Sequence, residues 1–124
     1  MANRFFENRS YTLEKATVSI YGVITCTGGN GAQTLTRAKG ITSVTQSSTG
    51  IWTIVFQDLY NALLSATVEF LSPAGTVSDW YIKTWTPSTG TLVAQIVSPA
   101  GASTSPANTN VGYLEFVFSN STAL

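Results

Sequence analysis

The chain has 124 residues, with six basic and six acidic side chains that cancel to a formal net charge of zero, no histidine and one cysteine. This length suits a single domain that buries roughly two-thirds of its unfolded surface. Charged residues make up 10% of the chain, against about 25% in typical soluble domains. Without clustered lysine and arginine the chain lacks the attraction that nucleic acids and anionic membranes require, so we expect neither as a partner.

Residues 1–14 carry four of the twelve charges together with several aromatic side chains in no clear period. The segment lacks the apolar core of a secretory signal, so we expect synthesis in a reducing cytoplasm. It is either a frayed terminus or an arm that lies on a neighbouring subunit or a larger assembly, because exposed phenylalanines are costly unless covered. The candidate contact residues of this arm are Phe5, Phe6, Arg9 and Tyr11. Residues 15–124 then form one β-sandwich domain.

The first strand is predicted over residues 16–27, where apolar side chains alternate with polar ones. Gly22, in its middle, indicates a bulge or a close approach of another backbone. Cys26 falls on the apolar face, and we interpret it as a small core residue rather than a nucleophile. The glycine-rich stretch 28–31 is a turn and not a phosphate loop, since neither Lys-Ser nor Lys-Thr follows it. Residues 32–37 form a short strand.

A β-hairpin over residues 39–57 is the clearest element of the chain. Its second arm is almost entirely β-branched or aromatic, which is typical of a strand. The alternation places Trp52, Ile54 and Phe56 on one face. A Ser- and Gly-rich loop over 46–50 connects the two arms.

The next stretch, residues 58–64, is the only one with a helical pattern, because Asp58 is a plausible N-cap and Leu59 and Leu63 are four residues apart. We expect one short helical turn there. A strand over 66–71 and a β-turn over 72–75 follow.

Three further strands are predicted. Residues 77–85 place Trp80 on one face and both Tyr81 and Trp85 on the other. Residues 91–97 are apolar on both faces, which indicates a central strand or one covered by a partner. Residues 98–110, rich in Pro, Ser and Thr, form a long loop that we expect to be the most mobile segment. Residues 112–119 form the closing strand.

These seven to eight strands with one helical turn predict an all-β fold, an antiparallel β-sandwich or jelly roll. The surface is covered by hydroxyl groups, since the chain has 14 serines and 19 threonines but three lysines. Monomers usually protect exposed strand edges with charge, lysine above all. We therefore expect other copies to cover some edges and faces, which makes the protein a homo-oligomer.

The residue types argue against catalysis and against a cofactor. Without histidine the chain lacks the usual general base and metal ligand, and its carboxylates show no spacing that pairs them for glycoside hydrolysis. Ligands for zinc or calcium are missing as well. Its aromatic residues allow two interpretations, a stacking platform for sugars or a mixture of core and subunit-contact residues. They are Tyr60, Trp80, Tyr81, Trp85 and Tyr113.

The chain contains the segments YGVI (21–24), KGITSV (39–44), TGIWTIVF (49–56), YNALL (60–64), TLVAQI (91–96), GYLEF (112–116) and NS (120–121). Together they resemble a recurrent pattern in small virion proteins of tailed bacteriophages. The resemblance extends over residues 17–121, although similar hairpins also occur in unrelated trimeric β-domains of tail fibres and C1q-like heads.

The resemblance implies a virion protein made in the cytoplasm of the host bacterium, foremost a capsid decoration (cement) protein on the capsid surface. Such a protein would bind the major capsid protein, with a trimer as the favoured oligomer and residues 1–14 as the docking arm. The alternative is a tail-fibre or receptor-binding domain that holds a host glycan with Tyr81 and Trp85. An inert packing domain of a baseplate or connector is a third interpretation. No catalytic residues come with the resemblance.

Overall fold

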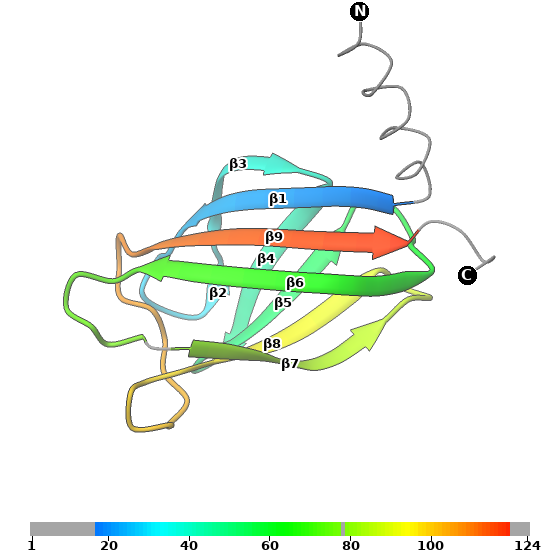
Figure 1. Cartoon of the computed structure of the whole chain (residues 1–124). Coiled ribbons are helices and arrows are strands. Elements are labelled where there is room, and N and C mark those ends of the chain that lie inside the picture. Colours follow the sequence, from blue (N-terminus) through cyan, green and yellow to red (C-terminus); the bar gives the residue numbers. More distant parts are fainter. Residues whose placement is uncertain (1–16, 78, 120–124) are drawn as a thin grey trace, which may run out of the picture.

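The computed structural model describes residues 17–77 and 79–119, which form nine strands in two antiparallel sheets packed face to face (Figure 1). The strands are β1 (Thr17–Thr25), β2 (Gly31–Ala32), β3 (Thr34–Lys39), β4 (Ile41–Ser48), β5 (Ile51–Phe56), β6 (Ala62–Leu71), β7 (Asp79–Thr86), β8 (Thr91–Val97) and β9 (Val111–Ser119). The predicted all-β antiparallel sandwich is confirmed.

Each sheet joins strands that are distant in the sequence. The four-stranded sheet has the order β3-β1-β9-β6, and the five-stranded sheet has the order β2-β4-β5-β8-β7. The first and last strands, β1 and β9, pair along nine residues from Thr17 opposite Ser119 to Thr25 opposite Val111. The two chain ends of the described domain therefore lie at the same end of the sandwich, and β8 is a central strand, as its two apolar faces predicted.

The core lies between the sheets, where inward side chains alternate with outward ones along every long strand. Trp52, Ile54 and Phe56 of β5 are all buried, as the hairpin pattern predicted. They face Phe116 and Phe118 of β9, which are also buried, and the ring of Phe56 meets both phenylalanines edge to face at centroid distances of 5.2 and 4.9 Å. This aromatic cluster joins the two layers.

The predicted helical turn over 58–64 is wrong, because the described residues contain no helix and β6 already begins at Ala62. The Asn61 amide donates to the Ser119 carbonyl, and Ala62 and Leu63 pair with the end of β9. Tyr60 is buried and stacks on Phe118 at 4.6 Å. A helix of one or two turns is marginally stable by itself, so the strand pairing with β9 and the packing of Tyr60 on Phe118 determine the conformation of this segment.

The hairpin turn is tighter than predicted, since β4 runs to Ser48 and only Thr49 and Gly50 connect the arms. Gly50 has a φ of +72°, and a Cβ atom there would lie 2.8 Å from the Ile96 carbonyl oxygen. At Gly22 a Cβ atom would lie 2.9 Å from Ile41 Cδ1, the end of a flexible side chain, but 3.7 Å from the nearest backbone atom, the Arg37 carbonyl oxygen. The predicted close approach of another backbone is therefore not found, and the pairing of β1 with β3 instead shifts register just beyond Gly22, between Val23 and Ile24. Of these two glycines, only Gly50 is required by its φ and by neighbouring backbone atoms.

Candidate interaction surface

Four of the six contact residues predicted from the sequence, Phe5, Phe6, Arg9 and Tyr11, lie outside the described residues. The docking arm of residues 1–14 therefore stays a prediction. The other two residues, Tyr81 and Trp85, both lie on β7, the edge strand of the five-stranded sheet.

The structure separates Tyr81 from Trp85. The pairing of β7 with β8 shifts register between Ile82 and Thr84, so Lys83 is an additional residue and the faces invert after it. Trp85 consequently points inward and packs against Phe118 at a centroid distance of 5.1 Å. The prediction that Trp85 shares a face with Tyr81 is thus wrong.

The remaining aromatic side chains do not form one stacking platform either. Trp80 packs edge to face on Phe116, and Tyr60 is buried. Tyr81 and Tyr113 are about half exposed, but they lie on different sheets. The Tyr81 hydroxyl donates to Gln95 Oε1 at 2.7 Å across the strand pair. The five-stranded sheet therefore offers a glycan a single exposed ring, that of Tyr81, whereas Tyr113 shares the outer face of the four-stranded sheet with the half-exposed Tyr21.

The outer face of the five-stranded sheet forms a continuous uncharged surface across its three middle strands β4, β5 and β8. Paired residues of neighbouring strands share this face, for example Thr53 opposite both Thr45 and Val93. Their side chains are half-buried by one another, and none is charged. The surface consists of Ser43, Thr45, Ile51, Thr53, Val55, Thr91, Val93, Gln95 and Val97, which we call the neutral face.

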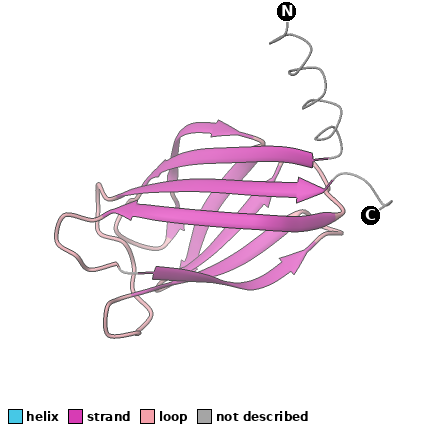
Figure 2. Cartoon of the chain, viewed as in Figure 1, coloured by secondary structure: helices cyan, strands magenta, loops and turns pink. Residues whose placement is uncertain are grey.

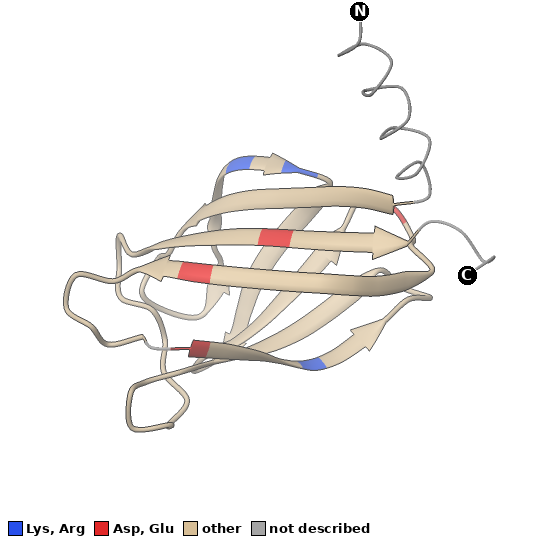
Figure 3. Cartoon of the chain, viewed as in Figure 1, with Lys and Arg blue, Asp and Glu red and all other residues tan. Residues whose placement is uncertain are grey.

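The outer face of the four-stranded sheet is different, because it carries four of the seven charges among the described residues (Figure 3). Two basic side chains lie on edge strand β3, and two acidic ones lie on β9 and β6. Two tyrosines between them are half exposed. The surface consists of Tyr21, Val23, Arg37, Lys39, Thr67, Glu69, Tyr113 and Glu115, which we call the charged face.

Sequence reasoning located part of the neutral face. The apolar alternation of residues 91–97 already indicated a strand with two apolar sides. For β4 and β5, the sequence showed only that polar or β-branched side chains occupy one face of the predicted hairpin. No sequence signal showed that these strands lie beside β8, because that pairing joins residues about forty positions apart, such as Thr53 and Val93.

Buried amide groups join the long loops, which gather at the end of the sandwich away from the described chain ends (Figure 2). Gln46 is 2% exposed, accepts from Trp52 Nε1 at 3.1 Å, and donates to Asn30 Oδ1 and Ser105 Oγ. Gln33 is also buried and donates to two carbonyls of the glycine-rich turn. These bonds satisfy polar groups that would be costly if left unpaired.

The 98–110 loop is anchored to the rest of the sandwich by several contacts. Ser103 Oγ donates to the Thr49 carbonyl at 2.5 Å, and the Thr104 amide donates to the Ile96 carbonyl at 3.0 Å. Pro106 is fully buried. The composition of a loop does not reveal such partners, because they come from the turn of the distant hairpin and from the end of β8.

Cys26 is a free thiol with 1% of its surface exposed, as predicted for a core residue. Burial raises the pKa of this thiol to about 11, so it is protonated at neutral pH. A protonated and inaccessible thiol is a poor nucleophile.

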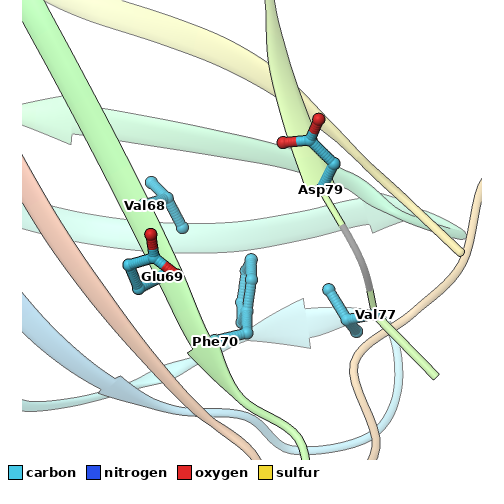
Figure 4. A pocket seen from close by; sticks show the side chains of 5 residues that line it. All are labelled: Val68, Glu69, Phe70, Val77 and Asp79. Atoms are coloured by element: carbon cyan, nitrogen blue, oxygen red, sulfur yellow. The ribbon is translucent and has the colours of Figure 1, made fainter. Parts of the chain in front are cut away.

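A small cavity of about 120 Å³ opens between β6 and the start of β7 (Figure 4). Its lining combines apolar side chains with two carboxylates, those of Glu69 and Asp79. Pockets for small molecules usually have volumes of about 300–1,000 Å³, so this one is too small for most ligands. Within the described ranges no group of three or more acidic or cysteine side chains could hold a metal ion, and no helix is suited to crossing a membrane.

Comparisons of the chain with protein-family models, curated proteins and solved structures found no match.

Proposed function

We propose that the chain is a non-enzymatic structural protein of a tailed-bacteriophage virion that decorates the capsid and binds the major capsid protein. The virion setting comes from the resemblance of its strand segments to small phage virion proteins. The mode of binding is supported by one structural observation, the neutral face of the five-stranded sheet.

The neutral face suits contact with another protein because little solvation is lost when it is covered. Its central positions are valine, isoleucine and threonine, and depletion of charge is the compositional mark of an interface core. β-branched side chains such as Val93 and Ile51 have few rotamers to lose on binding. A rigid sheet face can be repeated on every equivalent site of a symmetric shell.

The glycan-binding alternative loses the pair of rings on which it depended. Trp85 is directed into the core, and the hydroxyl of Tyr81 is already engaged by Gln95. A single tyrosine provides one stacking contact, whereas sugar sites use several aromatic and polar groups together. The capsid proposal does not need these rings.

The first experiment is to count copies of the chain per virion by quantitative mass spectrometry, calibrated against the major capsid protein. A decoration protein on a symmetric shell should be present in on the order of hundreds of copies. A count of roughly ten would place the protein in the tail and contradict the proposal.

A second experiment tests the neutral face directly. Capsids that lack the protein are incubated with the purified full chain, or with its Val93→Asp variant, and bound protein is measured after sedimentation. A carboxylate buried in the contact should weaken binding by at least about 2 kcal/mol, roughly thirtyfold. Ala74→Asp, in the exposed turn between β6 and β7, is the matched control and should bind like the wild type. Full binding by Val93→Asp would exclude the neutral face as the contact.

A further inference from the structure

The charged face has an ordered arrangement of charge along its cross-strand rows. One row runs from Arg37 on β3 through Val23 and Tyr113 to Glu69 on β6. Its positive and negative ends thus lie on the two opposite edges of the sheet, which is visible in Figure 3 as blue on β3 and red on β6.

The next row repeats this polarity. It begins with Lys39 on β3, passes Tyr21 and then reaches Glu115 on β9 and Thr67 on β6. The basic edge and the acidic strands are therefore separated in both rows in the same direction.

The opposite charges at the ends of the first row are too far apart to pair within one molecule. Two strands lie between β3 and β6, and neighbouring strands are about 4.8 Å apart, so the backbones at Arg37 and Glu69 are separated by about 14 Å. Both side chains are exposed. Each end of the row is available to a charge supplied by another molecule.

We propose that a second copy of this chain packs its charged face against the charged face of the first copy. The two copies are related by a two-fold axis that runs parallel to the strands and lies midway between the two charged faces. This operation reverses the order of strands while keeping each row at its own height. Arg37 of one copy then faces Glu69 of the other, and the same contact is made a second time by symmetry, as in any isologous interface. The aligned packing of two sheets at about −30° is compatible with this axis.

The uncharged members of the rows also meet suitable partners in this arrangement. Tyr113 of one copy lies over Val23 of the other, and Tyr21 lies over Glu115, whose carboxylate can accept from the tyrosine hydroxyl. Tyr21 is 51% exposed and Tyr113 is 49% exposed in the single chain. Tyrosine is enriched at interfaces because its ring is apolar and its hydroxyl finds a partner.

The face is large enough for a specific contact. It is four strands wide, and β1 and β9 pair along nine residues, so its outline is about 19 by 30 Å at the usual strand spacings. The two copies together then bury more than about 1,000 Å², the area at which specific interfaces begin. The neutral faces point away from this contact, so the inference goes beyond the capsid proposal and does not depend on it.

Charge reversal in the full-length protein tests the arrangement by sedimentation equilibrium. The wild type should sediment as a dimer. Arg37→Glu places acidic groups opposite each other at both contacts, and Glu69→Arg places basic groups opposite each other, so each variant alone should dissociate at least tenfold more readily. Lys83→Glu, the same change of charge on the other sheet, should leave the dimer unchanged.

An equimolar mixture of the two single variants gives the decisive measurement. In the mixed dimer every reversed charge meets a complementary one at both contacts, so association should return to the wild-type level. Circular dichroism of each variant verifies that the fold is retained. A monomeric wild type, the trimer that the resemblance to virion proteins favours, or failure of the mixture to associate would overturn the two-fold arrangement.

Discussion

Two tryptophans with opposite hydrogen-bonding states provide a sharp test of the core. Trp52 is 1% exposed, and its Nε1 donates to the buried Gln46 Oε1 at 3.1 Å. The Nε1 of Trp85 is buried, and no hydrogen-bond partner for it exists among the described residues. Replacing each tryptophan by phenylalanine removes a similar part of the ring but changes hydrogen bonding in opposite ways.

The expected costs follow from these contacts. Shortening either ring leaves a void of about 40 Å³, which costs about 1 kcal/mol. Trp52→Phe also leaves the Gln46 acceptor without its buried donor, at about 1–3 kcal/mol, for a total of about 2–4 kcal/mol. Trp85→Phe instead removes a buried N–H group that had no hydrogen-bond partner. The stability regained in this way is similar to the cost of the void and offsets it. We expect the free energy of unfolding of the Trp85 variant to stay within about 1 kcal/mol of the wild type.

Urea unfolding followed by far-ultraviolet circular dichroism measures both variants without relying on tryptophan fluorescence, and equal m-values verify that the same surface is exposed. Combining Trp52→Phe with Gln46→Leu in a double-mutant cycle should reveal a coupling of about 1–2 kcal/mol. Equal destabilisation by the two tryptophan substitutions, or a larger effect at Trp85, would show that the hydrogen bond between Trp52 and Gln46 does not stabilise the core.

Three other outcomes are expected. Burial raises the pKa of Cys26 from its ordinary value of 9.0 to about 11 in the folded protein. The stability that depends on the protonated thiol is therefore complete below about pH 9, and about 2–3 kcal/mol of it is lost as the pH rises through 11. Cys26→Ala should remove this part of the alkaline destabilisation in urea titrations at successive pH values. The same thiol should react with a disulfide reagent at neutral pH only after unfolding, and rapid labelling of the native protein would contradict its burial. Gly50→Ala should destabilise the protein by at least about 2 kcal/mol more than Gly101→Ala in thermal unfolding. Both glycines have a positive φ, but of the two only Gly50 would place a Cβ atom 2.8 Å from backbone oxygens. Similar losses of stability in the two variants would show that these close contacts relax.

Local pattern was sufficient for the fold class and for the division of most strands into two faces. The alternation around Trp52 and Phe116 has the period of a strand, and burying one face of each strand requires a second layer. The core position of Cys26 followed from the same alternation. These properties depend on residues two positions apart in the chain, so the sequence is sufficient to predict them.

Tertiary structure decided what depends on distant residues. One additional residue, Lys83, inverts the face of Trp85, and a bulge of this kind is visible only against the partner strand. Pairing with β9 turned the predicted helix at 58–64 into a strand start, and contacts from the hairpin turn anchored the 98–110 loop. The neutral face and the ordered rows of the charged face likewise exist only once β8 lies beside β5, and β9 between β1 and β6. Alternation along each strand is therefore sufficient to predict the two layers of this protein, whereas long-range strand pairing establishes which side chains share its surfaces.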